Sequence, residues 1–245
     1  LDQIKLKGTY LAGDHSISGG VEYEKLDIFN LFVQFAEGEY RFATIDDFAN
    51  RRASRLQYQN AFTNNKFDGA AAFGYDVMGL FLQDQWRITP DLELQYGLRY
   101  ERYSTSDKPL QNDNFQSRYG FSNQQTLDGK DLLMPRLGFN WAVADSTVIR
   151  GGVGLFGGGT PNVWVSNNYS NNGVIVVSQT ITRPASGIEP RLDNVNGFDI
   201  PQVVQDAHSG LRGDGNVNAL DPSFSIPSAW KYSLGLEHTF DSGWR

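Results

Sequence analysis

The chain has 245 residues, 40% of them hydrophobic, which suits one large β domain or two ordinary ones with a sizeable core. Its formal net charge of −7 disfavours a nucleic-acid partner, because neutralising phosphates takes a surplus of lysine and arginine. The chain has no cysteine, which excludes a disulfide-stapled scaffold and a thiolate metal site.

Hydropathy leaves both a soluble and a membrane-bound fold open. No run of about 18 apolar residues occurs, which excludes a membrane-spanning helix. The mean hydropathy of −0.42 is also compatible with a membrane barrel, whose strands are only half apolar and whose polar loops dilute the average. The first residues, LDQIKLKGTY, alternate like a strand and do not form a signal peptide, so we expect an internal piece of a larger protein.

The chain opens on two segments in which apolar and polar residues alternate, 3–11 and 16–25, on either side of the short turn AGDH. This period of two predicts half-buried strands. A long polar stretch follows, at about residues 26–76, and its segment TIDDFANRRAS has the periodicity of a short helix.

The next hairpin, FLQDQWRITPDLELQYGLRYERY, has the strongest alternation and predicts strands at 77–88 and 92–103 around the turn TPD. In the second strand one side carries Leu92, Leu94, Tyr96, Leu98 and Tyr100, and the other carries Glu93, Gln95, Arg99 and Glu101. In the first strand Asp84 shares the apolar row with Trp86. We expect Asp84 to be exposed near a membrane interface, where a charge costs only about 0–1 kcal/mol.

After a second polar stretch, at about residues 104–130, strands are predicted at 131–143 and 147–157 around the turn ADS. A third polar stretch, at about 158–228, precedes the last predicted strand, 229–240, which ends at DSG. The alternation in these strands again separates two sets, the apolar Leu137, Phe139, Leu234 and Leu236 and the charged Arg136, Arg150, Lys231 and Glu237.

Short and long connections therefore alternate along the chain. A soluble sandwich has no physical reason to keep every second connection tight, whereas a membrane barrel has short periplasmic turns at one rim and long extracellular loops at the other. Each predicted strand reaches the roughly 9–11 residues of a tilted crossing. We predict an all-β fold: an antiparallel transmembrane β-barrel segment of about seven spanning strands in the bacterial outer membrane. The remaining strands must come from elsewhere, since an open edge leaves backbone groups unsatisfied in lipid.

Aromatic residues fall near both ends of the predicted strands. Trp86, Trp141 and Phe240 lie close to the short turns, and Tyr100, Tyr103 and Trp230 lie toward the long connections. Two aromatic belts about a strand length apart are typical of bilayer interfaces, although soluble sheets also carry aromatic residues at strand ends.

The barrel prediction fixes which side of each strand faces inward, because a charge facing lipid at mid-bilayer costs about 2–4 kcal/mol. The predicted lumen-facing wall comprises Glu93, Gln95, Arg99, Glu101, Arg136, Arg150, Lys231 and Glu237. The predicted lipid-facing residues are Leu92, Leu94, Leu98, Leu137, Phe139, Leu234 and Leu236. The wall charges either pair with one another and with a plug, which we favour, or line a polar substrate path.

Three segments resemble TonB-dependent outer-membrane receptors. The hairpin LFLQDQWRITPDLELQYGLRYERY has the family's pattern of QDxWR, a Thr-Pro/Asp turn and LxLxxGLRYE. MPRLGFNWAVADSTVIRGGVGLF is similar to a following hairpin with PRxGxxW and RGGxGxF, and LDPSFSIPSAWKYSLGLEHTF to a later segment with DPxFxxPxxWxxSLGxEH. In this order they point to the Oar-like branch and cover about residues 80–245.

The resemblance implies a barrel of about 22 strands that is occluded by an N-terminal plug and imports ligands with energy delivered through TonB. We expect residues 1–245 to be part of that barrel domain, without the plug, the TonB-binding segment and the remaining strands. The implied partners are outer-membrane lipid, the TonB complex through the missing N-terminal region, and a small ligand, peptide or saccharide.

Catalysis finds little support in the sequence, and we predict no enzyme and no cofactor. His15, His208 and His238 are expected in a turn, a loop and a strand, without metal-ligand spacing. The glycine-rich GGVGLFGGG lacks the helix that a nucleotide-binding loop needs after it, because TPNVWVSNN follows.

One segment, GDGNVNALDP, resembles part of a calcium loop, with Asp214, Asn216, Asn218 and Asp221 as candidate ligands. Gly210 and Arg212 occupy the two positions where such a loop needs oxygen ligands, so a plain Asn/Asp turn is the interpretation that we favour.

Ligand recognition would fall to the long connections. Trp164, Tyr169 and Phe198 are candidate ligand contacts through stacking, and packing within the loops is the interpretation that we favour for them. The alternatives to a receptor are a structural or adhesive outer-membrane β protein and, less favoured, a soluble β-sandwich binding module.

Overall fold

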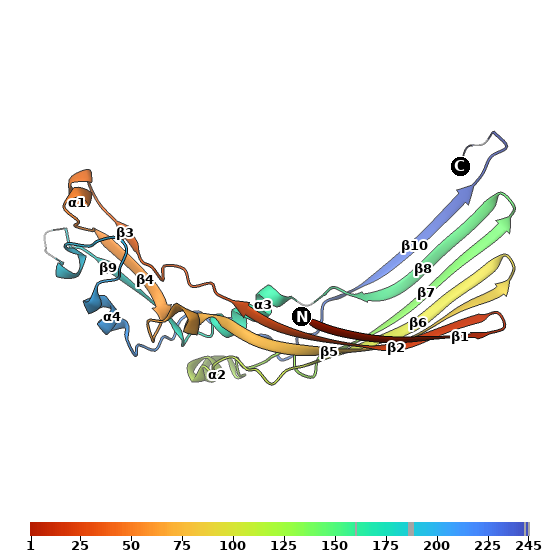
Figure 1. The fold of residues 1–245 in the computed structure, drawn as a ribbon, viewed down its shortest axis with the longest axis horizontal. Coiled ribbons are helices and arrows are strands. Elements are labelled where there is room, and N and C mark those ends of the chain that lie inside the picture. Colours follow the sequence, from red (N-terminus) through yellow and green to blue (C-terminus); the bar gives the residue numbers. More distant parts are fainter. Residues whose placement is uncertain (160, 186–188, 243, 245) are drawn as a thin grey trace.

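The computed structural model describes residues 1–159, 161–185, 189–242 and 244. Its main feature is one antiparallel sheet of seven strands, in which each strand pairs with the preceding and the following long strand of the chain. The strands are β1 (Asp2–Ala12), β2 (His15–Asn30), β5 (Ala71–Thr89), β6 (Leu92–Ser104), β7 (Asp131–Ala144), β8 (Thr147–Gly157) and β10 (Ser228–His238). Figure 1 shows the long strands curving side by side at one end of the molecule.

The seven strands of this sheet confirm the seven that alternation predicts, and the short turns AGDH, TPD and ADS lie where the sequence places them. The fourth predicted turn, DSG, includes Gly243, which lies outside the described residues. The boundaries of β2 and β5 were wrong, because these strands run further into the long connection, to Asn30 and from Ala71. The extensions pair with one another, Asn30 opposite Ala71 and Ile28 opposite Phe73. On one side of these extensions Ala71, Phe73 and Tyr75 are buried in a cluster with residues of the long connections. On the other side Phe29 and Ala72 are exposed.

The two longest connections build a second body, which we call the loop lobe. It contains a three-stranded sheet of β3 (Glu39–Arg41), β4 (Arg55–Ala61) and β9 (Val176–Thr182), together with α1 (Ile45–Ala49), η2 (Pro190–Leu192) and α4 (Gln202–His208). Its core consists of Ala53, Leu56, Tyr58, Ile181, Leu192, Val195 and Val204. Figure 1 shows the loop lobe at the end opposite the free turns of the long strands.

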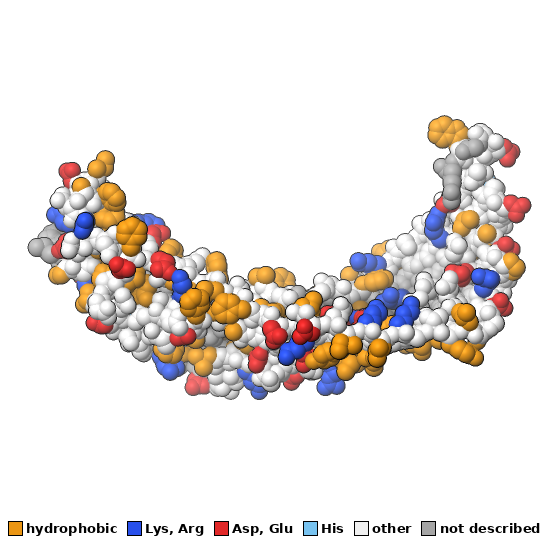
Figure 2. Space-filling view, viewed as in Figure 1, with side chains coloured by type: hydrophobic (Ala, Val, Ile, Leu, Met, Phe, Trp, Pro, Cys, Tyr) orange, Lys and Arg blue, Asp and Glu red, His pale blue; other side chains and the backbone are white. Residues whose placement is uncertain are grey.

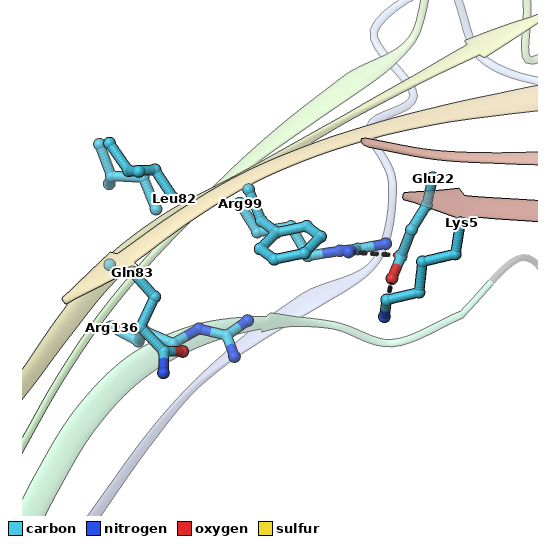
Figure 3. A pocket seen from close by; sticks show the side chains of 9 residues that line it. Lys5, Glu22, Leu82, Gln83, Arg99 and Arg136 are labelled. Carbon is cyan, nitrogen blue, oxygen red and sulfur yellow. Dashed lines mark ion pairs between the residues drawn. The ribbon is translucent and has the colours of Figure 1, made fainter. Parts of the chain in front are cut away.

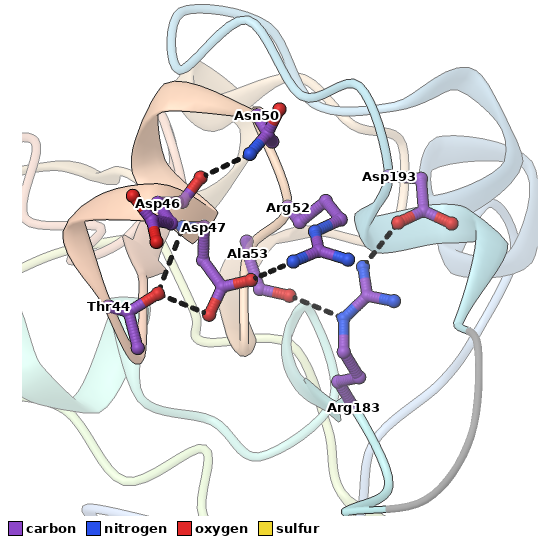
Figure 4. Close-up of polar contacts among 8 residues, drawn as sticks. All are labelled: Thr44, Asp46, Asp47, Asn50, Arg52, Ala53, Arg183 and Asp193. Carbon is purple, nitrogen blue, oxygen red and sulfur yellow. Dashed lines mark hydrogen bonds and ion pairs between the residues drawn. The ribbon is translucent and has the colours of Figure 1, made fainter.

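Hydrogen bonds and ion pairs join segments at the surface of the loop lobe (Figure 4). Thr44 caps α1 by accepting a hydrogen bond from the Asp47 backbone N–H, which confirms the short helix expected in this segment. Asp47 also accepts from Arg52 at 2.7 Å. Arg183, which follows β9, donates to the Ala53 carbonyl and to Asp193 at 3.1 Å and 2.6 Å. This arginine therefore ties together segments from both long connections.

A third group of elements covers the junction between the long sheet and the loop lobe: η1 (Lys66–Gly69), α2 (Asp113–Tyr119) and α3 (Asn162–Ser170). The buried cluster here comprises Ala71, Phe73, Tyr75, Tyr103, Leu127, Val165, Tyr169, Leu220 and Ile226. Phe73 and Tyr169 stack with ring centroids 4.3 Å apart and an interplanar angle of 2°. The cluster joins the ends of the central strands to helix α3.

Two expectations fail at this junction. The segment TPNVWVSNN was expected not to be helical, yet α3 begins at Asn162 within it. The residues that α3 buries include Ser166, Asn168 and Ser170, so no apolar stripe announces the helix in the sequence. Tyr103 was expected in an aromatic belt and is instead buried in the junction cluster. In β6 it shares the side of Arg99 and Glu101, because side chains two positions apart point the same way.

Candidate functional site

The strand pairings divide the side chains of the long sheet into two faces, because residues directly opposite each other in neighbouring strands point to the same side. Lys5 lies opposite Glu22, Glu22 opposite Gly79, and Gly79 opposite Glu101. Following the register across all strands gives one polar face with Lys5, Glu22, Glu93, Gln95, Arg99, Glu101, Arg136, Arg150, Lys231 and Glu237. The eight wall residues expected from the sequence therefore share one face.

The opposite, apolar face carries the residues expected toward lipid. It contains Leu82, Leu92, Leu94, Leu98, Tyr100, Leu137, Phe139, Trp141, Trp230, Leu234 and Leu236. Many of them are strongly exposed, Leu82 at 60% and Leu234 at 79%. Figure 3 shows Leu82 pointing away from Glu22 and Arg99, on the other side of β5, and Figure 2 shows hydrophobic side chains gathered along one edge of the molecule with lysine and arginine above them.

An ion-pair network crosses three strands on the polar face (Figure 3). Glu22 of β2 pairs with Lys5 of β1 and, at 2.6 Å, with Arg99 of β6. Arg99 also pairs with Glu101 at 2.8 Å. Glu22 is only 7% exposed, so its charge depends on these partners. Lys5 and Glu22 were missed as wall residues, although the alternation in IKLKGTY and VEYEK places both on the polar side.

The network borders an open hollow of about 360 Å³, which is lined mainly by the polar face. Its polar and aromatic lining comprises Lys5, Glu22, Phe81, Gln83, Arg99 and Arg136. A second ion pair joins Arg150 of β8 to Glu237 of β10. Four of the expected wall charges are therefore engaged within the sheet itself: Arg99, Glu101, Arg150 and Glu237.

Asp84, on the apolar face, is not exposed as the sequence suggested; it is 9% exposed. Its Oδ2 accepts a hydrogen bond from His15 Nδ1 at 2.7 Å and one from the Tyr96 hydroxyl at 2.8 Å. His15 in turn stacks on Trp86, with ring centroids 5.1 Å apart. Groups from β2 and β6 thus cover the carboxylate and partner its Oδ2, while its Oδ1 is buried without a hydrogen-bond partner among the described residues.

The cluster at Asp84 supports a stability prediction. Replacing His15 with alanine removes one of two charge-assisted hydrogen bonds from a buried carboxylate, so we expect the sheet to lose about 1–3 kcal/mol of stability. The thermal unfolding of the whole protein in micelles measures this loss. Tyr10→Ala, at an exposed aromatic residue of the same face, is the matched control and should change little. Equal effects of the two substitutions would contradict the role of His15.

The other two histidines have structural contacts. His208 belongs to α4 instead of the expected loop and is fully buried. Its Nε2 lies 3.2 Å and 3.1 Å from the carbonyl oxygens of Asn60 and Ala61, so this nitrogen carries the proton and donates. His238, at the end of β10, contacts the Thr147 hydroxyl through Nδ1 at 2.7 Å. Within the described ranges, no group of three or more histidine, aspartate or glutamate side chains could hold a metal ion.

The candidate calcium ligands are committed to other contacts or spread along an open loop. Asp214 forms an ion pair with Arg118 of α2. Asp221 accepts hydrogen bonds from the backbone and hydroxyl of Ser223, and these bonds hold the pKa of its carboxyl below the ordinary value. Asn216 and Asn218 line an open, polar hollow beside β9 together with Asp214. This geometry is that of Asx turns and one surface ion pair.

The three candidate ligand contacts separate into two kinds. Trp164 and Phe198 are 66% and 85% exposed, on α3 and in the loop lobe. Tyr169 is 9% exposed and its hydroxyl donates to the Asp107 carbonyl at 2.9 Å, so it packs within the junction. Burial also raises the pKa of Tyr169, and it raises the pKa of Tyr40 in the loop lobe to about 12. Both phenols stay neutral at physiological pH.

Charged and aromatic side chains mark the two ends of the apolar face. At the end nearest the long connections lie Lys25, Asp76, Arg102 and Asp131, with Tyr100 donating to Asp131 at 2.9 Å. At the other end lies Trp86, ten residues from Asp76 along β5. Ten residues span about 34 Å along a strand, or about 26 Å along the normal at a tilt of about 40°. The height agrees with the apolar band of a membrane barrel, about 25 Å.

Comparisons with known proteins agree with this geometry. A family model described as "Outer membrane beta barrel domain" matches residues 2–245. No curated protein and no solved structure matches the chain. Among the helices that the structure describes, none is long and apolar enough to cross a membrane.

Proposed function

Because the chain belongs to the family of outer membrane β-barrel domains, we propose that it forms wall and outer loops of a TonB-dependent receptor, which binds a ligand and imports it across the outer membrane. The two-faced long sheet is the observation that carries this proposal. Its polar face would turn to the lumen and its apolar face to lipid, since charges at mid-bilayer are costly only on the lipid side.

The ion pairs of the polar face support a lumen that contains water or a second polar surface. Lys5, Glu22, Arg99 and Glu101 pair side by side, and such a network is stable beside water or a second polar surface. The receptor resemblance of the hairpin around Trp86 supplies the narrower expectation of a plug and of TonB-driven movement. The loop lobe, which is folded and has its own core, supplies a defined surface for the ligand.

The assignment of the two faces has a direct test in the central strand β6. Lysine at Leu98, on the apolar face, should cost about 2–4 kcal/mol and reduce insertion of the whole protein into the outer membrane. Lysine at Gln95, three positions away on the polar face, is the matched control and should insert normally. The amount of heat-modifiable protein in outer-membrane fractions measures both. Normal insertion of Leu98→Lys together with loss of Gln95→Lys would reverse the assignment.

Import is tested in cells that make the whole protein, with a panel of labelled small molecules, peptides and oligosaccharides. We expect one member to accumulate in these cells and to fail to accumulate in an otherwise identical strain without TonB. Removal of the loop lobe should abolish accumulation while the barrel remains in the membrane. Accumulation that is independent of TonB would instead identify a passive pore.

An adhesive or structural outer-membrane protein is the second candidate, and one observation favours it. The loop lobe and its neighbours expose large apolar side chains, including Phe32, Ile45, Phe48 and Phe198. Exposed apolar groups of this kind often mark contacts with other macromolecules. Surface attachment of cells that is lost on replacing these residues, with no ligand accumulated in either strain, would support this candidate over the receptor.

A further inference from the structure

The polar face also contains a pair of basic side chains, Arg136 and Lys231, on the two strands that flank a glycine of β8. Gly154 of β8 lies directly opposite Arg136 of β7 on one side and directly opposite Lys231 of β10 on the other. Two strand spacings, roughly 10 Å, separate the two cationic residues at the backbone. Phe156, two positions further along β8, projects from the same face.

The missing side chain at Gly154 lets the Phe156 ring and Arg136 lie close over the backbone of β8. A Cβ at this position would lie 3.0 Å from the Phe156 ring and 3.2 Å from the Arg136 Cβ. Gly138 and Gly152 continue the bare backbone toward the short turns. The result is an open hollow of about 340 Å³, whose polar-face lining consists of Gln95, Arg136, Gly138, Gly152, Gly154, Phe156, Lys231 and Ser233.

The two cations at this hollow have no carboxylate partner among the described residues, whereas three other cations of the polar face do. Arg99, Arg150 and Lys5 all form ion pairs, whereas neither Arg136 nor Lys231 pairs with a carboxylate in the part of the chain that the structure describes. Both cations instead lie over the Phe156 ring, at 5.6 Å and 5.4 Å from its centroid. Two like charges held over one ring repel each other, and an anion bound by both would offset that repulsion.

We propose that this hollow binds an oxyanion, a phosphate or carboxylate group of a ligand. The Arg136 guanidinium supplies paired N–H donors for two oxygens, and the Lys231 ammonium supplies a second charge. Gln95 and Ser233 provide neutral donors at the rim, and Phe156 provides apolar contact for a ring or alkyl group attached to the anion. The inference rests on the proposed function in one respect, that the polar face is the one turned to the lumen.

The test uses the whole protein purified in an uncharged detergent, and the probes are inorganic phosphate, phenyl phosphate, benzoate and benzyl alcohol. We expect saturable binding of the anions and no binding of benzyl alcohol, and phenyl phosphate should bind more tightly than inorganic phosphate. Whether phosphate or carboxylate is the better group is decided by comparing phenyl phosphate with benzoate. Equilibrium dialysis measures all four.

Arg136→Gln and Lys231→Gln should each weaken binding of the tighter anion about tenfold, because each removes a charge-assisted contact. Arg87→Gln is the matched control, since Arg87 is an exposed cation of the same face that does not line the hollow, and it should weaken binding less than twofold. Gly154→Val should abolish binding without changing the charge, because a side chain here would displace the Phe156 ring and Arg136. If this variant fails to fold, Arg136→Gln and Lys231→Gln still test whether the anion binds at this hollow.

Equal losses in Arg87→Gln and Arg136→Gln would overturn the proposal, because general electrostatic attraction would then explain binding. Equal binding of benzyl alcohol and phenyl phosphate, or no saturable binding of any anion, would overturn it as well. The measurement needs neither TonB nor uptake. Failure of TonB-dependent import therefore leaves its outcome unaffected, and loss of anion binding leaves the import experiment unaffected.

Discussion

Replacing Arg99 with leucine is expected to destabilise the long sheet by about 3 kcal/mol, because the substitution leaves two carboxylates without their shared cation. Arg99 pairs with Glu22 at 2.6 Å and with Glu101 at 2.8 Å. The side chains of these two glutamates are only 9% and 18% exposed. Breaking a buried ion pair costs about 3–5 kcal/mol, and the lower end applies since Arg99 itself is partly exposed.

This change is measured on the whole protein in micelles, as the temperature at which its folded, heat-modifiable form is lost. Arg87→Leu is the matched control, because Arg87 is an exposed arginine of β5 on the same polar face of the sheet. Both substitutions change the charge equally. Arg99→Lys should restore part of the stability, as it returns the charge without the forked geometry. Arg99→Leu being no more damaging than Arg87→Leu would show that the pairing contributes nothing to stability.

Leu56→Ala should unfold the loop lobe without unfolding the long sheet. Leu56 is fully buried at the centre of the lobe core, and truncation of such a leucine costs about 2–5 kcal/mol. The lobe is a small cluster with few buried residues, so a loss of this size is comparable to its whole local stability. We expect β4 and β9 to lose their protection against hydrogen exchange, while β5 and β6 keep theirs.

Ile45→Ala is the control for this prediction, since Ile45 lies in the same lobe and is 85% exposed. It should leave exchange in β4 and β9 unchanged. A uniform loss of protection in both sheets after Leu56→Ala would mean that the lobe and the long sheet unfold as one unit.

The long sheet could be predicted from the sequence because each of its strands is a local pattern. Alternation alone shows the sides on which Leu94, Leu98 and Gln95 lie, and the tight turns fix three of the six strand pairs. The same parity could have placed Lys5 and Glu22 on the wall and Tyr103 inside. The pairing of particular charges could not be predicted, because register and side-chain reach decide whether Arg99 or Arg136 meets a carboxylate.

The loop lobe could not be predicted, because its contacts are non-local. β4 pairs with β9 across more than a hundred intervening residues, and no turn connects them. Both strands are short and rich in polar residues, so neither stands out from the loop around it. The prediction that Asp84 is exposed was wrong for a related reason. Its partners His15 and Tyr96 come from two other strands, and only their meeting makes a carboxylate acceptable on an apolar row.

The pairing of β4 with β9 has a mechanical consequence. One of these strands belongs to the connection between β2 and β5, and the other to the connection between β8 and β10, four strands away in the sheet. Arg183 adds a second cross-link by gripping the Ala53 carbonyl. The two connections therefore cannot swing independently. A displacement of the loop lobe is therefore transmitted to two separate parts of the long sheet, at β2 and β5 and at β8 and β10.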